Sequence, residues 1–312
     1  MLATRKFELE SVLAPGYVFM PDVPSPADPL FEAHPRNYAD NCYVYPVLSR
    51  RAGGMSIGVN LNLDRVCNFH CVYCQVDRTT PAEADLVDLP RLAAELDRMV
   101  ELVVSGVIYQ GPQFRDTPAP LRRLNDIALS GDGEPTAYAN FDEVVNVCAE
   151  VRRRRCPADV KLVLITNASL LHRPRVRRAL ETLDANGGEV WAKLDAGTED
   201  YYRLVNRSAI PWRQILDNLR EAALVRPIVI QSMFLRIHGE APLPAELEAY
   251  CDRLDEITAA GGRIKLVQIY TLARRPVESW VAALGYAEVD AVAELVRRRT
   301  NLPTAAFYGH PG

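Results

Sequence analysis

The hydrophobic pattern of the chain alternates between short apolar runs and longer stretches with helical spacing. From Ser56 onward, runs rich in aliphatic and β-branched residues are followed by segments whose apolar positions recur every three or four residues. We expect the apolar runs to be strands, over residues 56–63, 126–131, 161–167, 189–196, 228–235 and 264–272. This alternation predicts an α/β fold with a parallel sheet and fewer strands than a complete eight-stranded barrel.

The helical segments also account for two isolated cysteines. A first helix is predicted after Asp88 and Pro90, which suit a cap and a first turn. Cys148 and Cys251 each fall on the apolar stripe of a later helical segment. We therefore expect both thiols to pack in the core rather than to take part in chemistry.

Three parts of the chain are predicted. Residues 1–54 are rich in proline and aromatic residues and lack the alternation, so we expect an irregular N-terminal extension. Residues 55–275 form the α/β core, and residues 276–312 a C-terminal helical segment. Residues 106–125 form a second irregular insert within the core.

Composition narrows the setting without naming a partner. The 312 residues are 48% hydrophobic and 24% charged, and the formal net charge of −4 does not indicate a nucleic-acid binder. No apolar stretch has the length of a membrane span or the form of a signal peptide. The seven cysteines do not resemble a secreted disulfide framework, so we expect a cytoplasmic protein.

The most informative segment is CNFHCVYC, residues 67–74. Cys67, Cys71 and Cys74 follow the first predicted strand, at the edge of the sheet where parallel α/β folds place their chemistry. These residues are compatible with two kinds of metal site. His70 could complete a tetrahedral zinc site, whereas an iron-sulfur cubane held by three thiolates would leave one iron open to a small molecule.

The spacing C-x3-C-x2-C, with Tyr73 before the last cysteine, resembles the radical S-adenosylmethionine (radical SAM) superfamily. After the second strand, SGDGEPT places Gly133, Glu134 and Pro135 where that superfamily has a Gly-Glu-Pro motif, although Asp132 replaces the usual glycine. The resemblance covers residues 56–272. It implies a partial (βα)6 barrel, a 4Fe-4S cluster on the three cysteines, and S-adenosylmethionine as cofactor.

Further residues come from the same resemblance. Asn167, in ITNAS, matches a polar strand end common in the family, and Lys193 and Asp195, in AKLDAG, could reach the ribose hydroxyls of the cofactor. Alternatively, Asp195 caps the following turn and Lys193 pairs with it. The resemblance thus implies one set of cofactor-binding residues: Tyr73, Gly133, Glu134, Pro135, Asn167, Lys193 and Asp195.

The implied activity is reductive cleavage of S-adenosylmethionine to a 5′-deoxyadenosyl radical that abstracts hydrogen from a substrate. An external donor of the flavodoxin or ferredoxin type would supply the electron. The substrate stays open among small molecule, RNA and protein. A glycyl-radical-enzyme activase and a tRNA-modifying enzyme are alternatives, and a zinc-stabilised binding module is the non-enzymatic one.

SGDGEPT, KLDAGTEDYYRLVNR and KLVQIYTLARRP together resemble a bacterial branch related to wyosine-type tRNA synthases. Those synthases need a second cluster with its own three cysteines. Here the remaining cysteines are dispersed, at Cys42, Cys148, Cys156 and Cys251. This departure argues against the wyosine reaction.

The last two strands carry basic residues at their ends. FLRIHGE and YTLARRP are expected to bring four basic residues to the side of the cysteines: Arg236, His238, Arg274 and Arg275. We predict that they bind an anionic substrate, because a guanidinium donates two parallel hydrogen bonds to a carboxylate or phosphate. Alternatively, Glu240 and Glu278 neutralise them as surface pairs.

Overall fold

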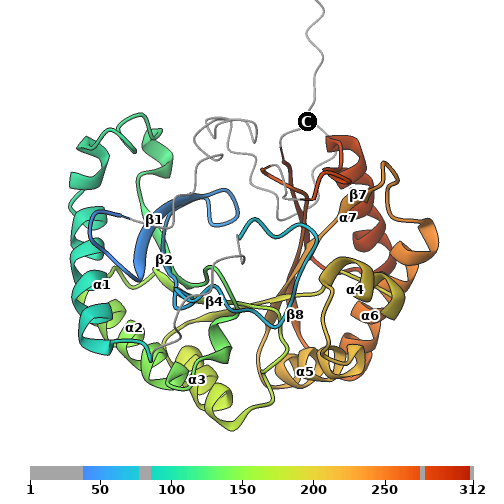
Figure 1. Cartoon of the computed structure of the whole chain (residues 1–312), viewed down its shortest axis with the longest axis horizontal. Helices are drawn as coiled ribbons and strands as arrows, with labels where there is room; N and C mark the ends of the chain where they lie inside the picture. Colours follow the sequence, from blue (N-terminus) through green and yellow to red (C-terminus); the bar gives the residue numbers. More distant parts are fainter. Residues whose placement is uncertain (1–37, 77–85, 275–277, 310–312) are drawn as a thin grey trace, which may run out of the picture.

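The computed structural model describes residues 38–76, 86–274 and 278–309, and its centre is a curved eight-stranded sheet (Figure 1). The strand order is β1-β2-β3-β4-β5-β6-β8-β10, with only β1 antiparallel to its neighbour. The strands are β1 Val44–Ser49, β2 Gly54–Val59, β3 Leu124–Leu129, β4 Lys161–Thr166, β5 Glu189–Lys193, β6 Ile228–Met233, β8 Ile264–Tyr270 and β10 Thr304–Phe307. A small antiparallel pair is formed by β7 Leu235–Ile237 and β9 Val281–Ala283.

Helices follow the strands along the chain and cover the outer side of the curved sheet (Figure 1). They are α1 Leu89–Val104, α2 Phe141–Arg155, α3 Pro174–Ala185, α4 Glu199–Asn206, α5 Trp212–Val225, α6 Pro244–Ala259 and α7 Tyr286–Thr300. Asp88 caps α1 as predicted, because its side chain accepts a hydrogen bond from the backbone of Arg91 at 3.0 Å. None of the described helices is long and apolar enough to span a membrane.

The predicted fold is confirmed, with additions at both edges of the sheet. All six predicted strands are present, as β2, β3, β4, β5, β6 and β8. The prediction of an irregular extension is wrong for Val44–Ser49, which pairs with β2, and β10 adds a strand beside β8. The proposed division of the chain at residues 54 and 275 stays a prediction, although the sheet continues past both points. The insert at 106–125 contains only short 3-10 turns before β3 begins at Leu124.

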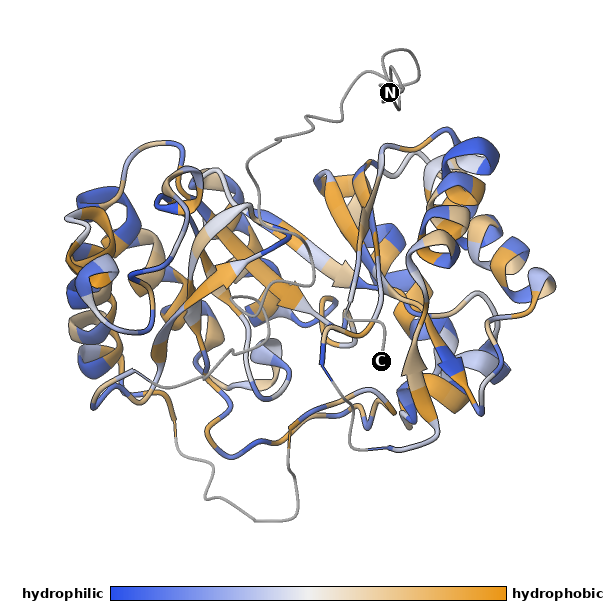
Figure 2. Cartoon of the chain, turned by 90° about the horizontal axis from the view of Figure 1, so that it is seen from above, coloured by the Kyte–Doolittle hydropathy of each residue, from blue (hydrophilic) through white to orange (hydrophobic). Residues whose placement is uncertain are grey.

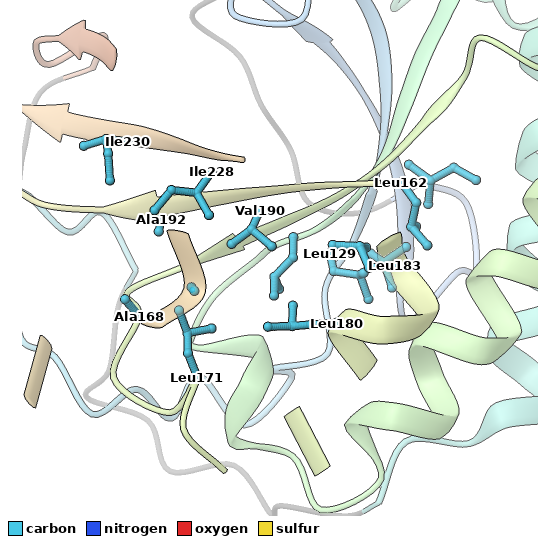
Figure 3. Close-up of a cluster of buried hydrophobic side chains, with 14 of the residues drawn as sticks. Leu129, Leu162, Ala168, Leu171, Leu180, Leu183, Val190, Ala192, Ile228 and Ile230 are labelled. Carbon is cyan, nitrogen blue, oxygen red and sulfur yellow. The ribbon is translucent and has the colours of Figure 1, made fainter. Parts of the chain in front are cut away.

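The outer face of the sheet forms the main core because alternate strand residues point the same way. Figure 3 shows Leu129, Leu162, Val190 and Ile228 of four neighbouring strands packed with Leu180 and Leu183 of α3. The helices accordingly turn hydrophobic residues toward the sheet and hydrophilic ones outward (Figure 2). Burial of this aliphatic layer stabilises the curved sheet and fixes the direction of the opposite face.

The inner face carries a different set of side chains. Val163, Trp191 and Val229 pack into a small apolar cluster there. Two residues further along the same strands are Ile165, Lys193 and Gln231, which line a cavity. The inner face is therefore filled by apolar side chains in the middle of the strands and lines a cavity where the strands end.

Candidate active site

The cavity inside the curved sheet has a volume of about 370 Å³, within the range of about 300–1,000 Å³ typical of small-molecule sites. It collects most of the residues that the sequence predicted. Its lining includes Cys67, Cys71, Cys74, Tyr73, Gly133, Glu134, Asn167, Lys193 and Arg274. Residues from five separate loops and strands thus meet at one place, as the strand order required.

The segment of residues 67–74, the cysteine loop, is docked on the end of α4. His70 and Val72 donate backbone hydrogen bonds to the carbonyls of Asn206 and Val205, at 3.0 and 2.9 Å. Phe69 packs edge-on against Tyr202 of the same helix, with ring centroids 5.8 Å apart. The position of the loop is therefore set by a helix more than 120 residues later in the chain.

Amide groups approach two of the sulfur atoms. The side-chain nitrogen of Asn206 lies 3.5 Å from Cys71 Sγ, and that of Asn167 lies 4.0 Å from Cys67 Sγ. Asn167 also donates to Asn68 Oδ1 at 2.7 Å, which links the end of β4 to the cysteine loop. All three cysteines of the loop are half-buried and none forms a disulfide.

The glycine turn after β3 packs directly on the segment that leads to the cysteine loop. A Cβ atom added to Gly131 would lie 2.1 Å from Asn60 Oδ1, and one added to Gly133 would lie 2.1 Å from the carbonyl oxygen of Val66. Both positions therefore require glycine. Asp132, which departs from the family motif, accepts a hydrogen bond from Asn60 Nδ2 at 2.8 Å and fastens the turn.

Glu134 is buried and holds the ends of two strands together. Its carboxylate accepts hydrogen bonds from Thr136 N at 3.2 Å, Thr136 Oγ1 at 2.5 Å, Thr166 Oγ1 at 2.6 Å and Asn167 N at 2.7 Å. Burial raises the pKa of Glu134, and these donors oppose part of the rise. The hydrogen bond from Thr136 N also caps the 3-10 turn Pro135–Ala137, in which Pro135 is buried beside the cavity lining.

Lys193 and Asp195 form a network with Tyr73. Asp195 accepts hydrogen bonds from the Tyr73 hydroxyl, from Asn206 Nδ2 at 3.0 Å and from Met233 N at 2.9 Å. Lys193 Nζ lies 3.7 Å from Asp195 and donates to the Tyr73 hydroxyl at 2.5 Å. Asp195 does not cap the next helix, since Thr198 does so, but the predicted pairing of Lys193 with Asp195 is present.

The electrostatic state of Lys193 follows from this network. Burial alone would lower the pKa of Lys193, but the Asp195 carboxylate and the Tyr270 hydroxyl raise it above its ordinary value. Lys193 therefore presents a protonated ammonium group to the cavity. Asp195 itself lies behind Tyr73 and is not part of the cavity lining.

The structure does not bring Arg236 and His238 to the cavity. Strand β6 ends at Met233, earlier than predicted, and the chain then enters the β7–β9 pair. Arg236 forms an ion pair with Glu288 at 2.5 Å, and His238 stacks on Trp280 at 4.9 Å. Among the described members of the predicted anion site, Arg274 alone lines the cavity, and Arg275 lies outside the described residues.

Sequence reasoning missed two arginines that also line the cavity, Arg50 and Arg51. Both lie in the turn between β1 and β2, inside the segment that the sequence presented as irregular. Arg51 lies over the ring of Tyr270, 5.1 Å from its centroid. The available signal was the arginine pair between two short apolar runs, which would have been read as a hairpin had Val44–Ser49 been recognised as a strand.

The remaining candidates for metal binding lie elsewhere. His70 is exposed and does not line the cavity, although its neighbours in the cysteine loop do. Cys148 and Cys251 are buried in the main core, as predicted, and Cys42 and Cys156 pack at its margin. Within the described ranges, the three cysteines of the loop are the only ones in the cavity lining.

Comparison with known proteins identifies the family. Residues 61–242, which include the cysteine loop, match the model of the radical SAM superfamily. The chain belongs to the radical SAM superfamily. Members of this superfamily generally use S-adenosylmethionine, a 4Fe-4S cluster and a reductant.

Similar sequences include UPF0026 proteins and a protein named GTPase Obg. A UPF0026 protein of Helicobacter pylori is 29% identical over 69% of this chain and 62% of its own length, and one of Synechocystis sp. is 28% identical over 62% and 64%. GTPase Obg of Brachyspira hyodysenteriae is 24% identical over 78% of this chain and 32% of its own length. The chain thus spans about a third to two thirds of the length of these relatives.

Solved structures confirm the partial barrel. A structure of TYW1 with a lysine-pyruvate adduct bound has a TM-score of 0.52 and 17% identity, covering 84% of this chain and 85% of that one. A spore photoproduct lyase variant has a TM-score of 0.50 and 9% identity, covering 78% and 74%. At these identities the likeness establishes the fold.

The residues present fit the cofactors of the superfamily. Three half-buried thiols share one cavity, and amide donors near two of the sulfurs are the kind of support that iron-sulfur ligands receive. Gln231 lines the same cavity and is fully buried. Its amide donates to Gln268 at 2.7 Å, while its oxygen accepts no hydrogen bond from any described residue. A bound molecule that donates a hydrogen bond would satisfy that oxygen.

Proposed function

We propose that Cys67, Cys71 and Cys74 ligate a 4Fe-4S cluster and that S-adenosylmethionine binds beside it in the cavity, where it is cleaved to act on a substrate. The observation that carries this proposal is the convergence of the three thiols with the glycine turn on one cavity. When bound, the cluster supplies the electron that breaks the sulfonium bond of S-adenosylmethionine and yields a 5′-deoxyadenosyl radical. An external donor of the flavodoxin or ferredoxin type would supply that electron.

The chain's own residues bind and orient. The carbonyl groups of the glycine turn would accept hydrogen bonds from the ammonium group of the cofactor, because Gly131 and Gly133 let the turn pack against Asn60 and Val66 while it lines the cavity. Glu134 would hold that turn against the end of β4, since its carboxylate accepts hydrogen bonds from Thr136, Thr166 and Asn167. Its negative charge also favours an ammonium nearby.

Tyr73, Lys193 and Asp195 would position the nucleoside part of the cofactor. Tyr73 and Lys193 line the cavity, and Asp195 holds both in place from behind. Lys193 is an ammonium and therefore a hydrogen-bond donor to ribose oxygens.

The zinc-module alternative receives less support. A zinc site of four ligands would need His70, which is exposed outside the cavity lining. Cluster binding would use the three thiols without His70.

The direct test is anaerobic reconstitution of the full chain with iron and sulfide. We expect about four irons and four sulfides per chain for the parent protein and for His70→Ala, because His70 is no ligand in this account. Replacing Cys67, Cys71 and Cys74 together with alanine should abolish both. Zinc retained in preference to iron, and lost on His70→Ala, would overturn the proposal.

A further inference from the structure

Three guanidinium groups converge on the cavity from the two edges of the sheet. Arg50 and Arg51 come from the β1–β2 turn at one edge, and Arg274 follows β8, next to the strand at the other edge. All three side chains are half-buried. We call these three residues the arginine cluster.

The turn that carries Arg50 and Arg51 is held in a defined shape. Gly53 donates to the Ser49 carbonyl at 2.8 Å, Ala52 donates to Ser49 Oγ at 3.1 Å, and Asn125 donates to the Ala52 carbonyl. Gly53 has a φ of 72°, which glycine tolerates without strain. The two guanidiniums are therefore presented by a fixed turn.

The contacts of Arg50 and Arg51 leave both charges without a carboxylate partner among the described residues. Arg50 donates to the Tyr308 carbonyl, and Arg51 lies over the ring of Tyr270. Neither forms an ion pair with a carboxylate of the described residues, unlike Arg207, which pairs with Glu278 at 2.7 Å. Burial, with the positive charges of Arg51 and Arg274, lowers the pKa of Arg50 to about 10. Like charges are thus kept together at a cost that a bound anion would remove.

We propose that the arginine cluster is the site for a phosphoryl group of a small-molecule substrate. This inference rests on the proposed function, since it places the substrate in the cavity that holds the cofactor. Three guanidiniums provide forked donors and charge suited to a phosphate dianion. The cluster lines the interior cavity, and the net charge of the chain is −4, so a small phosphate ester fits it better than a polyanionic nucleic acid.

The test is isothermal titration calorimetry, in which inorganic phosphate is added to the anaerobically reconstituted chain. We expect binding with a Kd of about 1 mM or tighter. Arg51→Gln and Arg274→Gln should each weaken it by about tenfold or more, because each removes a charged donor. Arg51→Lys should retain part of the affinity. Arg213→Gln is the matched control, since Arg213 pairs with Asp217 on the exposed face of α5, and this variant should bind phosphate as the parent does.

Several results would overturn the inference. They are absence of phosphate binding to the folded parent, unchanged binding in both glutamine variants, acetate binding as tight as phosphate, or displacement of phosphate by an oligonucleotide without terminal phosphates. Circular dichroism verifies that each variant is folded, and Arg51→Lys serves if a glutamine variant is not. The iron content of each reconstituted protein is measured independently of the titration, so failure of cluster assembly and failure of phosphate binding are read separately.

Discussion

The cysteine loop and the arginine cluster line one cavity, but the charged groups around them differ in whether protein partners neutralise them. Around the cysteine loop, the carboxylates of Glu134 and Asp195 accept several hydrogen bonds each from protein donors. In the arginine cluster, Arg50 and Arg51 have no carboxylate partner among the described residues. The hydrogen bonds to Glu134 and Asp195 fix the geometry of the site before a ligand binds, whereas Arg50 and Arg51 keep positive charge available for a ligand. This difference suggests a cofactor half and a substrate half.

The largest effect is expected from a substitution in the glycine turn, which should weaken cofactor binding and leave phosphate binding intact. Gly133→Ala places a Cβ atom 2.1 Å from the Val66 carbonyl, so the glycine turn must move. We expect affinity for S-adenosylmethionine to fall at least about tenfold, or about 1.4 kcal/mol, with iron content and phosphate binding retained. Equilibrium dialysis with labelled cofactor measures it. Gly111→Ala is the control, because its nearest contact would be 3.4 Å. Equal loss in both variants would contradict the role of the turn.

Glu134→Gln tests whether the carboxylate acts as a structural acceptor. Its amide group would face donors where an oxygen now accepts, which should lower the free energy of unfolding by about 1–3 kcal/mol and weaken cofactor binding several-fold. Urea denaturation under anaerobic conditions gives the first number. Asp142→Asn, which removes a surface pair with Arg178, should cost at most about 1 kcal/mol. Parent-like stability and cofactor affinity in Glu134→Gln would refute this role.

A smaller effect is expected from the amide near Cys71. Asn206→Ala removes the donor 3.5 Å from Cys71 Sγ, and fewer hydrogen bonds to sulfur make a cluster harder to reduce. The reduction potential should fall by less than about 59 mV, which is tenfold in a one-electron equilibrium. Asn218→Ala removes a buried amide that donates to the Ala168 and Ser169 carbonyls, and should leave the potential unchanged. A shift common to both variants would show that the effect is not specific to the sulfur.

The smallest effect is expected at Cys251. Its side chain is fully buried beside Leu254, and burial raises its pKa to about 11. Cys251→Ala should lower the free energy of unfolding by about 1 kcal/mol and leave iron content, cofactor cleavage and turnover unchanged. Product analysis, once a substrate is in hand, decides it. Loss of product with cofactor cleavage intact would make Cys251 a hydrogen-atom donor instead.

The strands in the middle of the sheet could be predicted from the sequence because they are apolar runs covered by helices on the outer face. The edge strands have a weaker hydrophobic pattern. Strand β1 contains Pro46 and follows a proline-rich segment, and β10 has only four residues, so neither stood out. Because β1 was not predicted, Arg50 and Arg51 were not recognised as residues of the cavity lining. The cysteine loop could be recognised from the sequence because its three cysteines lie within residues 67–74. By contrast, the misplacement of Arg236 came from β6, which ends at Met233 before the β7–β9 pair.

The central claim is that the cluster on the cysteine loop binds S-adenosylmethionine directly. The most direct measurement is the electron paramagnetic resonance spectrum of the reconstituted, reduced chain with and without saturating S-adenosylmethionine. We predict that the cofactor changes the spectrum of the reduced cluster in the parent protein and in His70→Ala, because an open iron gains a ligand. An identical spectrum with and without the cofactor, in protein with its full iron content, would contradict the account.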